Sequence, residues 1–198
     1  KWGEGLYRLG YGTLESLAGL FGEEATIAPR CWLYSRFRES SETNLGYKVY
    51  HNEKVINVRI LWGVTPQEDE VSGLYSLLIA GTKFEPYQRK AMILSETNAK
   101  YLGIASAEVE KGPVQVTFMG ETWPVIGILS DNCTRLQELD AEGISPIQFD
   151  IPMNPWKIHV TPGYFVILPY ETVIDLGGTL ASVSLRFDNT SLVRDAAK

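Results

Sequence analysis

The segment from Leu77 to Asp131 constrains the fold of this chain more than any other, because strand and helix signals follow one another in it at short intervals. A short apolar run ends at Gly81, and a second run over Ala91–Leu94 leads directly into Ser95. Serine caps helices and glycine ends them, so we expect a helix from Ser95 to Leu102 that stops at Gly103. Such a sequence predicts a mixed architecture of strands and helices.

A hairpin is expected to follow in the same segment. Residues 114–118 alternate between apolar and polar types, which is the period of a half-buried strand. Gly120-Glu121 fits a two-residue turn with glycine at its first central position. The return strand, Trp123–Leu129, carries Pro124 near its start, which predicts an edge position or a bulge there.

The first third of the chain predicts one helix and three strands. Apolar residues at helical spacing indicate a helix over residues 13–22, and residues 24–35 form a strand that Pro29 either places at an edge or bends. Tyr47–Tyr50 and Lys54–Trp62 predict a hairpin. One face of its second strand is wholly apolar and is expected to point into the core: Ile56, Val58, Ile60 and Trp62.

Strands dominate the rest of the chain as well. Gly63–Glu70 is expected to be a polar turn, and a further helix is expected to begin at Asp188 or Asn189. The other expected elements are a helix over 134–139, strands over 146–151, 156–160, 164–168 and 181–187, and one helical turn over 171–176. Because the strands outnumber the short, scattered helices, we predict the α+β class.

Composition excludes several classes of function. With 198 residues, 44% of them hydrophobic, the chain can bury a core without disulfide staples. Its net charge of −6 and the lack of a basic stripe argue against a nucleic-acid partner. No apolar run approaches the roughly 20 residues that cross a bilayer. We expect that the chain belongs to a longer protein whose membrane anchor lies outside it.

The sequence carries no recognisable motif for catalysis, and we predict no catalytic, cofactor-binding or metal-binding residues. His51 and His159 lack the close spacing of metal ligands. The hydrolase nucleophile motif and the glycine-rich nucleotide loops are absent. Acidic residues cluster at Glu68-Asp69-Glu70 and at Glu108 with Glu110, and we interpret both clusters as solvated surface.

Two cysteines, Cys31 and Cys133, allow two interpretations. They are too few for a disulfide framework, and their spacing fits no zinc site. Burial as small apolar residues is the favoured interpretation. A single disulfide is the alternative if the domain is extracytoplasmic.

The tryptophans also have two interpretations. Trp32, Trp62, Trp123 and Trp156 lie on expected strands, where aromatic residues pack well. The alternative is an aromatic platform for a carbohydrate or protein partner. Trp2 is expected to lie near a membrane interface.

Six short phrases occur in a fixed order along the chain. They are Gly12–Pro29, Trp62–Pro66, Leu77–Phe84, Met92–Gly103, Val125–Leu129 and Val166–Thr172. Together they resemble the extracytoplasmic core domain of MacB/FtsX-type ABC transporter permeases. The chain departs from that pattern in two places: the acidic residue after the third phrase is Glu85, directly before Pro86, and residues 36–53 do not align.

The resemblance implies a two-lobed α+β domain. A porter-like lobe would be built from both chain ends, residues 1–75 and 178–198, with a β-rich lobe, residues 76–177, inserted between them. The resemblance also implies a non-catalytic domain on the periplasmic or extracellular side of the cell membrane.

Its implied role is to couple ATP hydrolysis, in a cytoplasmic ATP-binding domain or subunit, to the handling of substrates or partner proteins outside. An adaptor or envelope protein is a further partner that the resemblance implies. The resemblance implies that the protein contacts the membrane only through flanking helices outside this chain. It also implies a dimer as one possible state of the full-length protein.

Two other functions stay open from the sequence. A carbohydrate- or peptide-binding module of a cell-surface protein would use the tryptophans. A hydrolase would use carboxylates such as Glu108 or Glu110.

Overall fold

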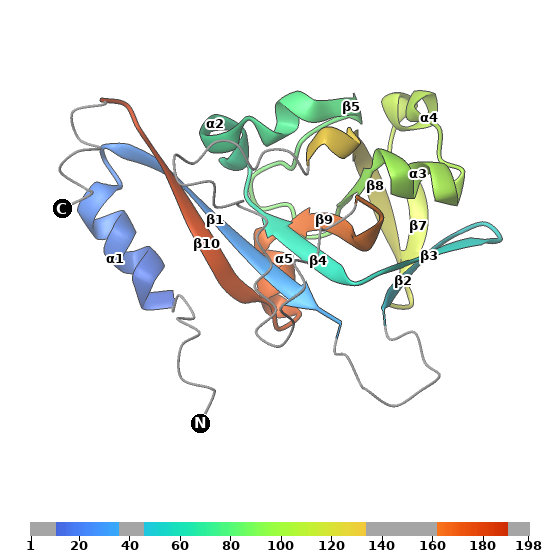
Figure 1. The fold of residues 1–198 in the computed structure, drawn as a ribbon, viewed down its shortest axis with the longest axis horizontal. Helices are drawn as coiled ribbons and strands as arrows, with labels where there is room; N and C mark the ends of the chain where they lie inside the picture. The colour runs from blue at the N-terminus through green and yellow to red at the C-terminus, as the bar shows by residue number, and fades with distance from the viewer. Residues whose placement is uncertain (1–10, 36–45, 134–161, 190–198) are drawn as a thin grey trace, which may run out of the picture.

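The structure, a computed structural model, describes residues 11–35, 46–133 and 162–189, which fold around one mixed β-sheet flanked by short helices (Figure 1). The helices are α1 (Tyr11–Phe21), α2 (Glu68–Ser72), α3 (Glu96–Leu102), α4 (Ser106–Lys111) and α5 (Tyr170–Asp175), with 3₁₀ turns η1 (Leu74–Leu77) and η3 (Pro162–Tyr164). The strands are β1 (Ala25–Tyr34), β2 (Tyr47–His51), β3 (Lys54–Val58), β4 (Ile60–Val64), β5 (Leu78–Gly81), β6 (Met92–Ser95), β7 (Val114–Phe118), β8 (Glu121–Leu129), β9 (Phe165–Pro169) and β10 (Thr179–Phe187). The predicted α+β class is confirmed.

The strands of the described residues follow the order β10-β1-β4-β9-β6-β8-β7-β2-β3, and β5 pairs with β8 outside this path. The pairs β4–β9 and β6–β8 are parallel, whereas the other pairs are antiparallel. Parallel neighbours need a crossover connection, and between β6 and β8 the chain makes it through α3, α4 and β7.

Segments from opposite ends of the described chain lie side by side, as Figure 1 shows for β1 and β10. Their pairing begins with Ala25 opposite Phe187, and the Phe21 ring meets the Phe187 ring edge-on, with 5.4 Å between centroids. A lobe built from both chain ends would need such a pairing. The sheet nevertheless continues from β10 to β3, and the division into two lobes stays a prediction.

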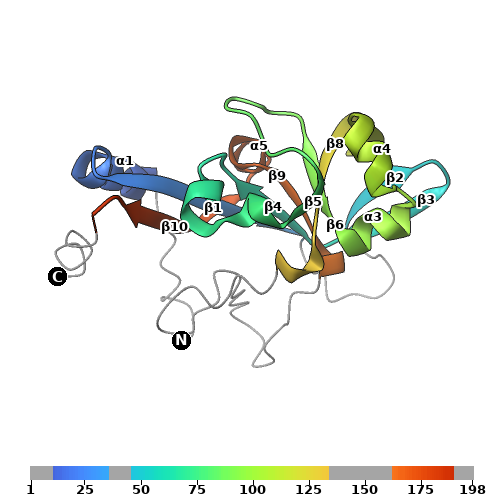
Figure 2. The same cartoon turned by 90° about the horizontal axis from the view of Figure 1, so that it is seen from above.

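Both faces of the central strands are buried, which explains why β4 and β9 are continuous apolar runs. On β4, Leu61 packs in the cluster that includes residues of α3, α4 and α5. Its neighbour Trp62 packs in the opposite cluster, with residues of η1 and with Phe84. The sheet is therefore the middle layer of the molecule. Figure 2 shows helices placed on both sides of it.

The strand predicted over Lys54–Trp62 is wrong as a single element. It breaks at Arg59 into β3, at one end of the sheet, and β4, near its centre. Arg59 donates its backbone N–H to the carbonyl oxygen of Tyr164 at 2.8 Å, and its guanidinium lies 5.2 Å from the centre of the Tyr164 ring. The predicted single face is consequently divided between the two core clusters: Ile56 and Val58 in one, Ile60 and Trp62 in the other.

The polar turn predicted over Gly63–Glu70 is wrong at both of its ends. Strand β4 continues one residue beyond Gly63, and α2 begins at Glu68. A Cβ atom at Gly63 would lie 2.2 Å from the Cys31 sulfur and 2.9 Å from the Val173 Cβ. Glycine is therefore required at this point of the strand by the close approach of α5 and β1.

The turn between β7 and β8 is shifted by one residue from its predicted position. Phe118 pairs with Glu121, so the two loop residues are Met119 and Gly120. Both have positive φ, 53° and 80° respectively. This is the turn type with two left-handed residues rather than the predicted type with glycine first.

The capped helix and the proline positions follow the predictions more closely. The Ser95 side chain accepts the Asn98 N–H at 3.2 Å, and Gly103, with φ of 73°, ends α3. Pro29 and Pro124 each lie one residue before a ladder begins, since β1 pairs with β4 from residue 30 and β8 pairs with β6 from residue 125. Each proline therefore has a strand on one side only.

Several predictions fall outside the described residues: the helix over 134–139, the strands over 146–151 and 156–160, and the helix after Asp188 or Asn189. Within the described ranges, every helix is too short or too polar to cross a membrane.

Candidate partner-binding groove

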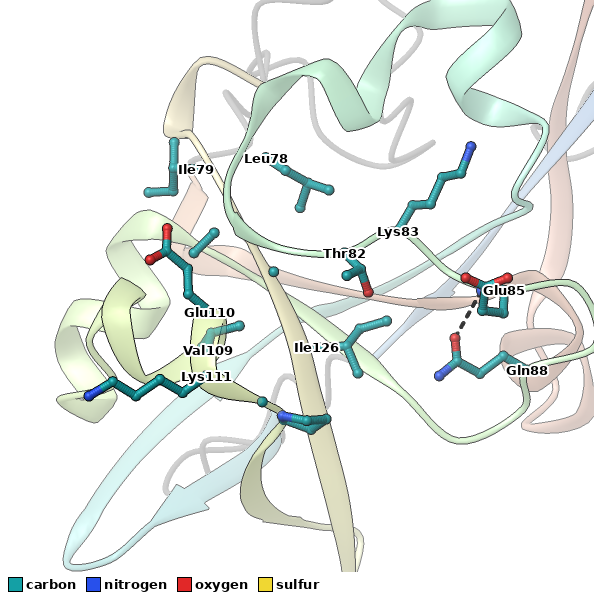
Figure 3. Close-up of a pocket in the computed structure, with 14 residues that line it drawn as sticks. Leu78, Ile79, Thr82, Lys83, Glu85, Gln88, Val109, Glu110, Lys111 and Ile126 are labelled. Carbon is teal, nitrogen blue, oxygen red and sulfur yellow. Dashed lines mark hydrogen bonds between the residues drawn. The ribbon is translucent and has the colours of Figure 1, made fainter.

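An open groove runs along β5, and Figure 3 shows the side chains around it. Two runs of consecutive residues form its walls, 78–83 on the side of β5 and 109–113 on the side of α4. Ile126 of β8, Glu85 and Gln88 complete the lining, and the volume is about 610 Å³.

The groove exists because β8 changes partner along its length. Its first half pairs with β7 as far as Val125, and its second half pairs with β5 from Gly127 onwards. Ile126 lies between the two ladders and lines the groove. Gly81 closes the ladder with φ of 81°, and a Cβ there would meet the carbonyl oxygen of Ile126 at 2.0 Å. The glycine therefore lets β5 approach β8 closely at this point.

The lining combines apolar and charged side chains. Ile79, Val109 and Pro113 supply apolar surface, and Ile79 is 42% exposed. The charged members are Lys83, Glu85, Glu110 and Lys111. Lys83 forms an ion pair with Asp69 of α2 at 3.4 Å. The other three form no ion pair with any described residue.

The loop over residues 82–90 borders one end of the groove and displays an aromatic side chain at its tip. The Gln88 N–H donates to the Glu85 carbonyl oxygen at 3.1 Å. The Glu85 N–H donates to the Gln88 side-chain oxygen at 3.0 Å, which is the dashed line in Figure 3. Between them, Tyr87 has φ of 64° and is 97% exposed. A bulky residue with positive φ is an outlier, and such outliers concentrate at functional sites.

The 82–90 loop is fastened to the rest of the molecule close to its second end. Arg89 pairs with Asp175 at 2.8 Å and with Glu171 at 3.9 Å, and its carbonyl oxygen accepts the Thr172 hydroxyl, so three residues of α5 hold the loop. Lys90 pairs with Glu121 at 2.8 Å and lowers the pKa of that carboxyl group by hydrogen bonding and charge. Tyr87 is thus displayed from a backbone that is held at its base.

The prediction that the first acidic cluster is solvated surface is wrong for Glu68. Glu68 is only 1% exposed and accepts hydrogen bonds from Arg30, at 3.0 and 3.1 Å from Nε and at 2.6 Å from Nη2. The Ser72 hydroxyl also donates to Glu68. The neighbours Asp69 and Glu70 bind Lys83 and Thr26 at the surface. Glu68 therefore fastens α2 to β1.

The other residues considered for chemistry have structural roles or lie apart. The Nδ1 atom of His51 is 3.0 Å from the Gln115 carbonyl oxygen, and His159 lies outside the described residues. Glu108 accepts the Ala105 N–H at 2.8 Å and so caps α4. Among the described residues, no group of three or more histidine, cysteine or acidic residues is arranged to hold a metal ion.

Both cysteines are buried, and no disulfide joins them. Cys31 belongs to one core cluster and Cys133 to the other. The Cys31 thiol donates to the Tyr170 carbonyl oxygen at 3.4 Å, and burial is the main reason that its pKa is raised. The structure agrees with the interpretation as small apolar core residues.

The tryptophans of the described residues form part of the core rather than a platform. Trp32, Trp62 and Trp123 are 8%, 3% and 7% exposed. Trp32 and Trp62 pack against each other with their rings tilted by 31° and the centroids 5.2 Å apart. Trp2 and Trp156 lie outside the described residues.

The described residues form an α+β domain with one mixed sheet, short helices on both faces of the sheet, and a groove beside β5. This fold places the chain in a class of protein. No protein-family model matches the chain, and no curated protein matches it. Solved structures do match, and two of them are a periplasmic region and the extracellular domain of an ABC-type transporter.

The chain is similar to the periplasmic region of MacB from Actinobacillus actinomycetemcomitans, with a TM-score of 0.51 and 16% identity over 86% of this chain. It spans 62% of the length of that structure. It is also similar to the extracellular domain of the noncanonic ABC-type transporter YknZ from Gram-positive bacteria, with a TM-score of 0.56, 16% identity, and coverage of 96% of this chain and 79% of that one. The resemblance that the six phrases indicated is confirmed at the level of the fold.

The groove itself was not predicted from the sequence. Its two walls come from segments that are about thirty residues apart, and α4 was not predicted at all. One signal was available, because the third phrase, Leu77–Phe84, includes the whole β5 wall, and Glu85 marks the departure from the family pattern.

Proposed function

We propose that this chain is a non-catalytic extracytoplasmic domain of an ABC transporter permease. The observation that carries the proposal is the similarity of fold to the YknZ extracellular domain over 96% of the chain. In the proposed role, the domain couples ATP hydrolysis, in a separate ATP-binding domain or subunit, to the handling of a substrate or partner protein outside the membrane. The 82–90 loop and the groove are the proposed contact surface.

The surface chemistry of the described residues supports a binding role. Loops that are held by a scaffold and display exposed side chains are where binding residues concentrate. Tyrosine supplies a large contact area at low entropic cost because it has only two side-chain torsions. Tyr87 combines both properties, since it is 97% exposed and its loop is held to α5.

The location is tested by labelling with a membrane-impermeant maleimide in intact cells that express the complete reading frame. Tyr101, which is 69% exposed on α3, is changed to cysteine. The unchanged protein is the matched control, because Cys31 and Cys133 are both 0% exposed and are expected to stay unlabelled. Labelling of Tyr101→Cys before lysis supports the proposal. Labelling that requires lysis contradicts it.

Coupling is tested with the same variant in membranes. If ATP hydrolysis drives a rearrangement of the outer domain, the labelling rate at Tyr101→Cys differs between two states. One is the nucleotide-free protein, and the other is the protein trapped with ATP and vanadate. A rate that stays the same, together with the absence of any ATP-binding domain or subunit from the purified complex, would overturn the coupling role.

A further inference from the structure

We propose that residues 85–90 are an ionic switch: exposed ion pairs hold this segment in one orientation at low ionic strength, and screening of those pairs releases it while the sheet stays folded. The inference rests on the proposed function only where Tyr87 is treated as a contact residue. The switch itself is argued from the packing and the charges of the segment.

Two buried residues fix the ends of the segment. Phe84 is 1% exposed, and its ring meets the Tyr75 ring edge-on, with 6.3 Å between centroids. Ala91, at the other end, is 0% exposed, and it belongs to the same core cluster as Phe84. Movement of the residues between these two anchors therefore leaves the core in place.

None of residues 85–90 is itself buried. Five of the six are exposed, and Gln88 has intermediate exposure. Segments with few buried apolar contacts open locally at low cost in free energy. The orientation of residues 85–90 consequently depends on their polar contacts.

Arg89 and Lys90 make the ion pairs that hold the segment. Arg89 pairs with Asp175 and Glu171 of α5, and Lys90 pairs with Glu121 of β8. All of these side chains are at least 47% exposed. Exposed pairs are screened by salt, and each one raises the ordered population by a factor of about five or less.

Two further contacts help to hold the segment. The Thr172 hydroxyl donates to the carbonyl oxygen of Arg89, and the Lys90 ammonium lies 5.8 Å from the centre of the Trp123 ring. Backbone strain acts in the opposite direction, because Tyr87 has φ of 64°, which is unfavourable for a residue with a side chain. Since the opposing contributions are all small, screening of the ion pairs is enough to shift the population towards the released state.

Release changes the surface that is proposed for partner contact. Glu85 and Gln88 lie together at one end of the groove, and Tyr87 lies between them in the sequence (Figure 3). The held segment presents these three residues in one arrangement, and preorganisation of this kind lowers the entropic cost of binding. Ionic strength therefore decides whether this end of the contact surface is preformed.

The experiment measures the distance between two nitroxide labels in the 198-residue chain by double electron–electron resonance. Tyr87→Cys carries one label, and Tyr101→Cys on α3 carries the other. Cys31 and Cys133 are 0% exposed and are expected to stay unlabelled. We expect a narrow distance distribution at roughly 10 mM salt and one at least about two-fold broader at about 1 M, because the Debye length falls from about 30 Å to about 3 Å.

Matched variants locate the switch within the loop. Arg89→Gln combined with Lys90→Gln should give the broad distribution at low salt. Lys83→Gln also removes an exposed ion pair of the 82–90 loop, but Lys83 lies on the other side of the Phe84 anchor. This variant should therefore keep the narrow distribution.

A second pair of labels reports on the rest of the domain. Tyr50→Cys on β2, combined with Tyr101→Cys, places both labels outside residues 82–90. Salt should leave the width of their distance distribution unchanged.

Four outcomes overturn the proposal. The distribution for the labels at 87 and 101 is already broad at low salt, or it stays narrow both at high salt and in the double variant. Lys83→Gln broadens it as much as the double variant does, or the labels at 50 and 101 broaden with salt to the same degree. Each of these outcomes leaves the proposed external location standing, because labelling in intact cells tests that separately. A domain that is labelled only after lysis keeps the switch and overturns the location.

Discussion

Two ion pairs of similar length hold the segments that follow β4 and β5, but they lie in opposite surroundings. Arg30 and Glu68 meet at 2.6 Å with side chains 6% and 1% exposed, and they hold α2 against β1. Arg89 and Asp175 meet at 2.8 Å with side chains 56% and 71% exposed, and they hold the 82–90 loop against α5. Ion pairs of similar length therefore serve two regions with different energetics.

The difference shows that burial, and not the distance between the charged atoms, decides how much an ion pair contributes to the free energy of unfolding. Breaking a buried pair leaves a charge without water or partner, whereas an exposed pair is replaced by water at little cost. The region around β1, β4 and α2 is accordingly a fixed frame. The 82–90 loop and the groove beside it can change their contacts without threatening that frame, which is a property that a binding surface needs.

The largest expected effect is at the buried pair. Glu68→Gln leaves the Arg30 guanidinium buried opposite a neutral amide, and we expect a loss of about 3–5 kcal/mol in the free energy of unfolding. Chemical denaturation followed by tryptophan fluorescence measures it, since Trp32 and Trp62 lie in the neighbouring core.

The control removes both charges. Arg30→Met combined with Glu68→Leu replaces the pair with apolar groups and should cost clearly less than Glu68→Gln alone. A double variant that is as unstable as the single one would show that shape, and not the unpaired charge, is responsible. The comparison between the two ion pairs would then fail.

Much of the fold was predictable from the sequence, and the errors in the predicted fold have a common cause. The helix capped by Ser95 and the strands with clear alternation carry local signals, and the structure contains them. The break at Arg59 and the burial of Glu68 depend on Tyr164 and Arg30, which are distant in the sequence. Local patterns cannot contain such partners, so both features were missed.

The second largest effect is expected at Gly63, also in the frame. Gly63→Ala forces a Cβ to within 2.2 Å of the Cys31 sulfur and 2.9 Å of the Val173 Cβ, and overpacking of this kind costs about 1–3 kcal/mol. Gly163→Ala is the matched control, because its nearest contact would be 3.6 Å from the Thr97 methyl carbon. Equal unfolding midpoints for the two variants would show that α5 can move away from β4.

A much smaller effect is expected at the exposed pair. Arg89→Ala should lower the free energy of unfolding by no more than about 1 kcal/mol, and salt should reduce the difference further because exposed charges are screened. Denaturation at low and high ionic strength measures both quantities. A loss close to that of Glu68→Gln would mean that the 82–90 loop belongs to the frame, and the contrast between the two regions would disappear.

The groove was harder to predict than the frame, for a physical reason. It forms where β8 passes from β7 to β5, and this change of partner leaves no trace in the alternation of residues 121–129. Tyr87 was equally inconspicuous, because an exposed tyrosine and a buried one are identical in sequence. Only the positive φ and the full exposure single it out.

The smallest effect on stability, and the sharpest test of the contrast, is expected at Tyr87. Its side chain is 97% exposed, and its φ of 64° costs a non-glycine residue about 1–2 kcal/mol. Glycine removes this strain, but it also raises the entropy of the unfolded chain, which offsets part of the gain in stability. Tyr87→Gly should therefore be neutral or raise the free energy of unfolding by less than about 1 kcal/mol. Denaturation checks this, with Tyr75→Gly as the buried counterpart that should be strongly destabilised by the loss of a core ring. If Tyr87→Gly were destabilising instead, the tyrosine would be a structural residue, and the argument that its strained backbone serves binding would no longer hold.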